Sequence, residues 1–380
     1  MGMDFDFDRV VDRSRSDSLK WGRYAGRDVL PLWVADMDFV APPAVLAALH
    51  QRLEHGVLGY GLPGAALGET VRRYLAAHYD WTVEPDWLVW LPGLVPGLNL
   101  ACRAIAGDVM TTTPIYPPFF SAPRFSGRSL ITTSLKLEAG EWQMDFAAME
   151  AAITPETRLY LFCHPHNPVG RAWRQDELQA FADFCERHDL LVCSDEIHCD
   201  LILDADRPHV PLAAFSPAMA QRTITLMAPS KTFNIPGLAC AFAVIPDAAL
   251  RRCFTSEMRG IMPDVNILGF AAAVAAFSDC EDWHRALIAI LRRNRDKVEA
   301  AVAKMPVLAM THVEATYLAW IDARGLNVDN PAGFFETAGI GLSNGADFGA
   351  PGWVRLNFAC PAPILDEALL RMQVAISGTA

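Results

Sequence analysis

Hydrophobic positions along the chain recur with two different periods. Some segments repeat apolar residues every three or four positions, which predicts amphipathic helices. Shorter apolar or β-branched runs, bounded by proline, glycine or polar residues, alternate with them and predict strands. The predicted helices are 44–55, 66–79, 97–105 and 175–189, and the predicted strands are 87–93, 109–114, 129–135, 190–197, 222–229 and 238–246. This alternation predicts an α/β fold in which helices cover both faces of a mostly parallel sheet.

The last hundred residues follow a different pattern. A long helix is predicted for 283–304, and a final helix is predicted from about Leu365. Between them lie three strand candidates, 315–322, 339–345 and 353–360, so this part is typical of a smaller α+β domain. The predicted organisation is therefore an N-terminal arm and part of the small domain at 1–45, a large domain at 46–280 and a C-terminal small domain at 281–380.

Composition narrows the class of protein. The 380 residues are 52% hydrophobic and 20% charged, which is typical of a globular protein. A formal net charge of −12 argues against a nucleic acid or a membrane as the main partner. Nine scattered cysteines contain no C-x-x-C pair, the N-terminus has no signal-peptide pattern, and proline and glycine break the uncharged stretches. We therefore expect a cytoplasmic protein that acts on a small molecule.

One lysine stands out from its surroundings. Between Arg222 and Asp247, the only charged side chain is Lys231, in the run LMAPSKTFNIPGLAC. A lysine in an apolar run is costly to bury unless it is neutral, paired or covalently occupied. The structural alternative is a lysine at a strand end that extends its amine to solvent. A desolvated lysine with a lowered pKa is instead the type that reacts with carbonyl groups.

Polar residues at the ends of two predicted strands suggest further chemistry. Asp195 directly follows an apolar strand, and its carboxylate requires a cationic partner there. That partner is either a pyridinium nitrogen or a metal bound together with Glu196 and His198. In LYLFCHPHNPVGR a further buried strand is predicted, and the turn that ends it carries Asn167. The amide of Asn167 can donate to a phenolate oxygen there, although many such residues are simply turn residues.

Three more positions match parts of a phosphorylated ring compound and its substrate. Gly93 lies between a strand and a helix, where backbone amides bind phosphate. Tyr116 is held among prolines in TPIYPPF and can stack on a flat ring. Arg355 lies in an apolar strand, where it is expected either to bind a carboxylate with both nitrogens or to form a structural salt bridge.

Together these groups match the aldehyde, pyridinium, phenolate and phosphate of pyridoxal 5′-phosphate. The chain also resembles the fold-type I family of enzymes that use this cofactor, and within it the PatB/MalY group of cystathionine β-lyases. The resemblance runs through the whole chain and is carried by DFDRVVDR, LPLWVADMDF, GVLGYG, TPIYPPF, CHPHNPVGR, SDEIHCDL, PSKTFNIPGL, TYLAWID and VRLNFACP.

The resemblance implies a role for each candidate residue. Lys231 would hold the cofactor covalently, Asp195 would face the pyridinium and Asn167 the phenolic oxygen. Tyr116 would stack on the ring, and Arg355 would bind the substrate's α-carboxylate. Ser230 and the backbone amides of Gly93, Leu94 and Val95 would hold the phosphate. Tyr60 of the neighbouring subunit in a homodimer would complete that phosphate site. His198 matches the group's motif in a supporting position.

The implied activity is β-elimination of cystathionine or related cysteine S-conjugates to a thiol, pyruvate and ammonia. An aminotransferase of the same family would use the same cofactor residues, and a regulatory interaction protein with residual lyase activity is an alternative of another class. Three positions depart from the common pattern, and these affect the expected shape of the pocket rather than the cofactor groups: Pro96, His164 and Pro236.

Overall fold

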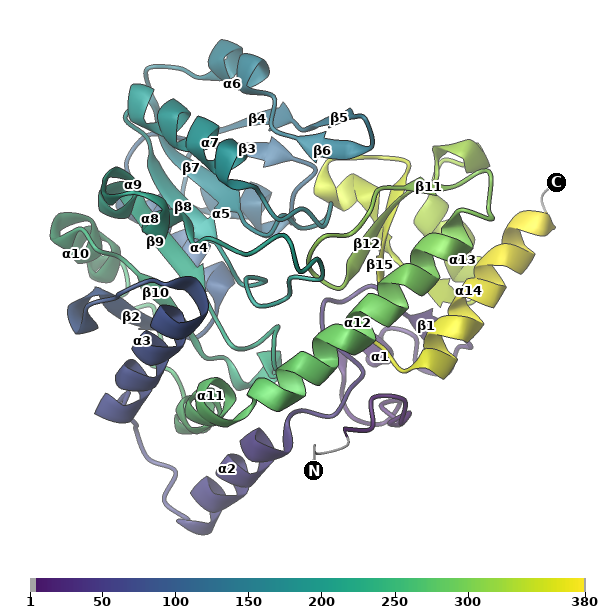
Figure 1. Ribbon diagram of the computed structural model, residues 1–380, viewed down its shortest axis with the longest axis horizontal. Helices are drawn as coiled ribbons and strands as arrows, with labels where there is room; N and C mark the ends of the chain where they lie inside the picture. Colours follow the sequence, from purple (N-terminus) through teal and green to yellow (C-terminus); the bar gives the residue numbers. More distant parts are fainter. Residues whose placement is uncertain (1–4, 379–380) are drawn as a thin grey trace.

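The computed structural model describes residues 5–378, and its secondary structure follows the predicted alternation closely (Figure 1). The boundaries of the predicted helices differ from the observed ones by at most three residues. The helices are α1 Leu19–Gly22, α2 Pro43–Glu54, α3 Ala65–Tyr79, α4 Leu94–Ala104, α5 Pro118–Phe125, α6 Phe146–Ala152, α7 Gln175–Arg187, α8 Leu212–Phe215, α9 Pro217–Arg222, α10 Ala248–Ser256, α11 Ile267–Asp279, α12 Glu281–Val302, α13 Pro331–Thr337 and α14 Ala362–Ser377.

The main sheet of the described residues has seven strands in the order β2-β10-β9-β8-β7-β3-β4. Neighbouring strands from β9 to β4 are parallel, whereas β10 is antiparallel to both β2 and β9. The predicted mostly parallel α/β fold is therefore confirmed. In sheet order the strands are Leu88–Leu91, Ala241–Val244, Thr223–Met227, Leu191–Asp195, Thr157–Cys163, Asp108–Thr113 and Leu130–Ser134.

Helices cover both faces of this sheet because its central strands are apolar on both sides. In β7, Leu159 and Leu161 pack with α4, α5 and α10, while the alternate residues Tyr160 and Phe162 pack with α6 and α7. This two-residue period is the geometry of a strand buried on both faces. Because β7 is buried on both faces, its sequence from Leu159 to Cys163 is continuously apolar and does not alternate between apolar and polar residues.

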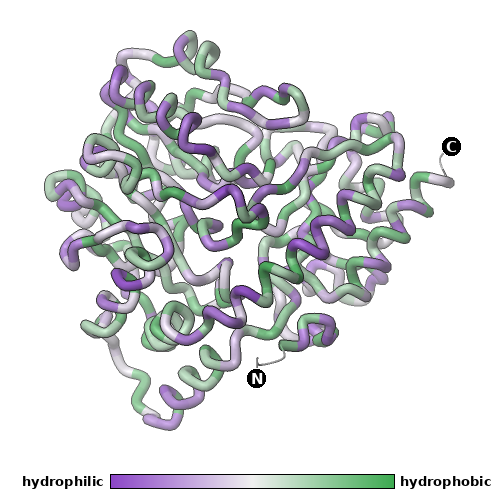
Figure 2. The backbone as a smooth tube through the Cα atoms, viewed as in Figure 1, coloured by the Kyte–Doolittle hydropathy of each residue, from purple (hydrophilic) through white to green (hydrophobic). Residues whose placement is uncertain are grey.

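The C-terminal part forms a second, smaller layer. Within residues 5–378, four strands pair in the order β11-β12-β15-β14, with bounds Ala309–Met310, Leu318–Asp322, Trp353–Asn357 and Ser343–Asn344. Helix α12 crosses beside this sheet, and its alternating hydrophilic and hydrophobic colouring in Figure 2 fits a helix with one face on the core. That face carries Trp283, Leu287 and Leu291, which are buried.

The N-terminal arm joins the small domain through backbone pairing. The segment 339–345, predicted as one strand, is in fact two: β13 (Ile340–Gly341) pairs in parallel with β1 (Leu30–Pro31) of the arm, and β14 pairs with β15. The single-strand prediction was wrong because the two halves bond to different partners. The remaining hairpin, β5 (Lys136–Glu138) and β6 (Glu141–Gln143), lies beside the main sheet (Figure 1). The predicted domain boundaries stay a prediction.

The described helices include none that combines the length and apolar character needed to cross a membrane. All nine cysteines carry free thiols, and Cys253 alone among them is exposed.

Candidate active site

The predicted site residues meet at one edge of the main sheet. In register, Cys163 of β7 lies opposite Asp195 of β8, which lies opposite Leu226 of β9. These parallel strands therefore end at the same edge, where ligands of open α/β sheets bind. The turns that follow them carry Asn167 and Lys231. A cavity of about 630 Å³ opens there, within the usual size range of ligand sites.

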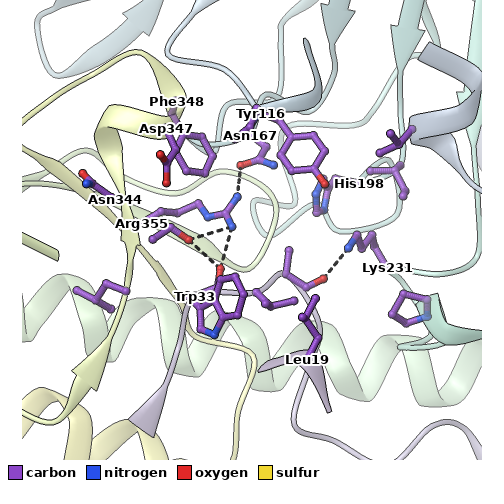
Figure 3. Close-up of a pocket in the computed structure, with 18 of the residues that line it drawn as sticks. Leu19, Trp33, Tyr116, Asn167, His198, Lys231, Asn344, Asp347, Phe348 and Arg355 are labelled. Atoms are coloured by element: carbon purple, nitrogen blue, oxygen red, sulfur yellow. Dashed lines mark hydrogen bonds between the residues drawn. The ribbon is translucent and has the colours of Figure 1, made fainter. Parts of the chain in front are cut away.

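Lys231 points into this cavity without a carboxylate partner. Its Nζ donates to the backbone carbonyl of Ala35 at 2.6 Å, and it forms no ion pair with any residue in the described part of the chain (Figure 3). Burial lowers the pKa of Lys231 to about 8, with the nearby Arg355 guanidinium acting in the same direction. An amine with this pKa is available in its neutral, nucleophilic form near neutral pH.

Asp195 places a buried carboxylate in the cavity lining. Its Oδ1 accepts from the backbone N–H of Ile197 at 3.2 Å, and burial raises the pKa of its carboxyl to about 7. A cation placed beside it would favour its ionised form. Glu196 points elsewhere and bonds Ser194, His209 and the N–H of Leu212. Asp195, Glu196 and His198 therefore do not share one centre.

Arg355 is buried and forms no salt bridge with any described residue, which leaves its charge for a ligand. Its guanidinium donates to Oδ1 of Asn167 at 2.9 Å, to the carbonyl of Trp33 at 2.9 Å and to Oγ of Ser343 at 3.3 Å. No carboxylate among residues 5–378 lies within ion-pair distance of it, and burial lowers its pKa to about 10. The structural salt bridge that the sequence left open is absent from the described residues.

In the side-chain amide of Asn167, the oxygen has a hydrogen-bond partner among the described residues and the nitrogen has none. Because Oδ1 accepts from Arg355, the amide places Nδ2 as a donor, and Nδ2 has no hydrogen-bond partner among the residues described. The structure thus couples the predicted phenolate donor and the predicted carboxylate ligand, which lie 188 residues apart in the chain. Asn167 also lines the cavity (Figure 3).

The predicted phosphate and ring residues line the same cavity. Gly93 adopts φ +154°, a conformation that favours glycine, and α4 begins at the next residue, Leu94. Leu94 and Val95 in the first turn of this 11-residue helix, whose backbone amides have no partner within the helix, line the cavity together with Ser230. Tyr116 follows β3 and lies above Lys231 in Figure 3. Pro96 sits in the first turn of α4 without interrupting it.

His198 lies in the cavity wall beside Tyr317. Its ring contacts the ring of Tyr317 edge-on, with 5.8 Å between centroids, and its Nδ1 is buried without a hydrogen-bond partner in the described residues. Burial, together with the charges of Lys231 and Arg355, holds the pKa of His198 well below its usual value. The ring is therefore neutral and can exchange a proton or a hydrogen bond with a ligand.

Tyr60 does not join the other residues. It lies fully exposed in the segment between α2 and α3, outside the cavity lining, together with the exposed apolar residues Val57, Leu58 and Leu62. A contribution of Tyr60 to a site is therefore possible only in a neighbouring subunit, and it stays a prediction.

Sequence reasoning missed several residues of the cavity. Trp33 and Ala35 act through backbone carbonyls, which bond Arg355 and Lys231. Phe348 places its ring 4.7 Å from the guanidinium carbon of Arg355, and Asp347 lies beside it. Trp33 and Ala35 lie in LPLWVADMDF, a motif that indicated only the family resemblance. Every residue has a backbone carbonyl, so residue type alone cannot predict which carbonyls form these hydrogen bonds.

Comparison with known proteins settles the family. Residues 27–372 match the model of the family described as aminotransferase class I and II. The chain belongs to this family. It is 34% identical to cystathionine β-lyase PatB of Bacillus subtilis, with 98% of this chain and 100% of that protein covered. The predicted resemblance and the fold-type I architecture are confirmed, and the family uses pyridoxal phosphate.

Two solved structures share the whole fold. The crystal structure of OvoB has a TM-score of 0.96 and 47% identity, and it covers 98% of this chain and 99% of that one. Cystalysin from Treponema denticola, whose crystal contains pyridoxal 5′-phosphate, has a TM-score of 0.95 and 34% identity with full coverage of both chains. Both structures therefore share the fold of this chain over its whole length, and both also share a third or more of its residues.

Proposed function

We propose that this protein is a pyridoxal-phosphate-dependent C–S lyase that eliminates the sulfur substituent of cysteine S-conjugates. The cavity suits the cofactor group by group. Lys231 supplies an unpaired amine for covalent attachment, Asp195 a buried carboxylate for a pyridinium, and Asn167 a free N–H for a phenolic oxygen. The α4 amides and Ser230 suit a phosphate, and Tyr116 suits the ring face.

The chain's own residues then divide the work of the reaction. When bound, pyridoxal phosphate withdraws electrons from Cα of the substrate. Arg355 holds the α-carboxylate, because its guanidinium is buried and without an anionic partner. Lys231 would hold the cofactor covalently, and its amine, when free, would remove the Cα proton, a role that suits its lowered pKa. His198 lines the same cavity, where burial and the nearby charges of Lys231 and Arg355 lower its pKa. It would support the bound cofactor ring from there.

Elimination follows when the Cβ–S bond breaks. The sulfur leaves with the electron pair of that bond and takes up a proton, giving a thiol. The remaining three-carbon unit loses its nitrogen by addition of one water and gives pyruvate and ammonia. The arrangement of Lys231 and Arg355 in one cavity supports proton removal at Cα, and similarity to PatB over the whole chain favours elimination over transamination.

The decisive test is pyruvate release from L-cystathionine without any keto-acid acceptor. The purified protein should show the visible absorption of a lysine-bound cofactor and release pyruvate and thiol in equal amounts. Turnover only after a keto acid is supplied would make the protein an aminotransferase. A protein that never acquires the absorption band, even with added cofactor, would contradict the cofactor assignment itself.

We also propose that the active form is a cytoplasmic homodimer in which Tyr60 reaches the partner's phosphate. The exposed apolar residues Val57, Leu58 and Leu62 support an interface at this segment, and the nine free thiols support a reducing compartment. Light scattering should give twice the mass of one chain. Tyr60→Phe should release cofactor faster during dialysis than Leu53→Gln, an exposed change on α2, and equal retention would count against the role of Tyr60.

A further inference from the structure

The segment SDEIHCD that ends β8 carries a second aspartate, Asp200, outside the cavity. Asp195 and His198 of this segment line the cavity, whereas Asp200 does not. The side chain of Asp200 is buried and bonds residues from two other parts of the chain, helix α3 and the turn that carries Lys231. Asp200 is therefore a buried carboxylate beside the active site to which the proposed function gives no role.

Three hydroxyl groups hold the carboxylate of Asp200. Its Oδ1 accepts from the hydroxyl of Tyr74 at 2.9 Å and from that of Tyr79, and both tyrosines belong to α3. Its Oδ2 accepts from Oγ1 of Thr232 at 3.0 Å. Burial raises the pKa of both tyrosines well above the usual value, with the charge of Asp200 acting in the same direction, so both stay protonated and donate. An ionised carboxylate can accept through both of its oxygens, whereas an amide has only one oxygen to accept with.

No cation balances this carboxylate. Asp200 forms no ion pair with any residue that the structure describes, in contrast to the buried Asp38, which lies 2.6 Å from Lys20 and 2.6 Å from Arg13. A carboxylate buried among neutral donors costs more than one that is paired with a cation. Hydroxyl donors to an ionised oxygen nevertheless form short, strong bonds that fix the geometry of both partners. What the three bonds of Asp200 supply is therefore a fixed position for the groups around it.

Thr232 passes this fixed position on to Lys231, because the two residues are adjacent in the chain. Lys231 lies in an irregular turn four residues after β9 ends, so no strand ladder holds it. Thr232 is completely buried, and its hydroxyl donates to Asp200. Two residues further on, Asn234 bonds the backbone of the N-terminal arm. The turn is therefore held to the arm by Asn234 and to the SDEIHCD segment by Thr232, the direct neighbour of Lys231.

The position of Lys231 matters because its amine has two tasks in the proposed function. It attaches to the cofactor, and when free it removes the Cα proton of the substrate. The amine stands at the end of a flexible four-carbon stem, so its reach depends on where the backbone of the turn is held. A displacement of about 1 Å at a reacting group can cost on the order of 10²-fold in rate. A tie beside Lys231 therefore affects both tasks.

We propose that Asp200, acting through the hydroxyl of Thr232, is a positioning residue that places Lys231 for cofactor attachment and for proton removal. The inference rests on the proposed function, because it concerns the same lysine in the same two tasks. The bond acts on where Lys231 lies and leaves its desolvation as it is. Loss of the bond should therefore slow both tasks without moving the pH at which the amine becomes neutral.

The test removes the hydroxyl of Thr232 while keeping the shape of the side chain. Thr232→Val is compared with Thr225→Val, which changes a completely buried threonine of β9 whose hydroxyl has no hydrogen-bond partner among the described residues. Thr232→Ser keeps the hydroxyl and serves as the rescue variant. Stopped-flow absorbance between pH 6 and 10 gives the rate at which pyridoxal phosphate attaches to each cofactor-free protein, and pyruvate release gives kcat and KM. Urea unfolding checks that each variant is folded.

Thr232→Val should lower the attachment rate and kcat by about tenfold each relative to Thr225→Val. The midpoint of the pH dependence should stay near 8, the lowered pKa of Lys231, and KM should not change because Arg355 still holds the substrate. Thr232→Ser should restore both rates. Asp200→Asn should act in the same direction as Thr232→Val, and the two changes together should cost little more than either alone, because they remove the same bond.

Equal rates in Thr232→Val and Thr225→Val would overturn the inference. So would a loss that Thr232→Ser does not restore, because the effect would then come from packing, or a midpoint that moves, because the bond would then act on desolvation. A wild-type protein that never attaches pyridoxal phosphate would contradict the proposed function instead.

Discussion

Two lysines, the buried Lys20 and the half-buried Lys231, bond to the same short segment of the arm but in opposite ways. Lys20 is completely buried, and its Nζ lies 2.6 Å from Oδ2 of Asp38, a carboxylate that is also buried. Arg13 and the indole of Trp21 bond the other oxygen of Asp38. Lys231 bonds only the carbonyl of Ala35 in that segment.

The difference separates a structural lysine from a reactive one. A buried ammonium is tolerated when a carboxylate and further hydrogen bonds replace its water, as they do for Lys20. Lys231 has only a neutral carbonyl, and burial therefore lowers its pKa to about 8. The missing partner is what makes the Lys231 amine reactive. The same substitution, lysine to methionine, should consequently have opposite effects at the two sites.

The largest effect should come from Lys231→Met. Without the amine, the protein should lose the absorption of bound cofactor and its lyase activity should fall by on the order of 10³-fold or more. The free energy of unfolding of the cofactor-free protein, measured in urea, should not fall, because a desolvated amine that bonds only a neutral carbonyl is replaced by an apolar side chain. A cofactor-free Lys231→Met protein that unfolds as easily as a Lys20 variant would remove the distinction between the two lysines.

Lys20→Met should act on stability. It leaves Asp38 buried with one cation fewer, and breaking a buried ion pair costs roughly 3–5 kcal/mol. Urea unfolding should show this loss while the folded variant still attaches cofactor through Lys231. Lys297→Met is the control: its partner Asp366 lies at 2.6 Å, but Asp366 is exposed and Lys297 only half-buried, so the loss should stay below about 1 kcal/mol. Equal losses in the two variants would show that the buried network adds nothing.

The smallest effect should be on the pH dependence of cofactor attachment to Lys231. Only a neutral amine attacks the cofactor aldehyde, so the rate of cofactor attachment to the cofactor-free protein should rise with pH and level off above about 8, the lowered pKa of Lys231. Stopped-flow absorbance between pH 6 and 10 measures this rate. A rate that still rises steeply towards 10.5, the ordinary value for lysine, would mean that the Lys231 amine is not desolvated.

Much of this protein is determined locally by its sequence. The apolar periods of α3, α7 and the central strands predicted those elements because helix and strand periodicity act over a few residues. Lys231 could be singled out because a lone charge in an apolar run is itself a local feature. Asp195 and Asn167 could be placed at one sheet edge because parallel strands end together.

What only the tertiary structure decided depends on pairings between distant segments. The division of 339–345 into β13 and β14 results from bonds to β1 and β15, which no local pattern records. The sequence could not decide whether Arg355 binds a ligand or forms a structural salt bridge. The fold decides it, because the groups that surround the guanidinium are the neutral oxygens of Trp33, Asn167 and Ser343. A residue type fixes which bonds a group can make, whereas folding decides which partners remain for it and which charges are left for a ligand.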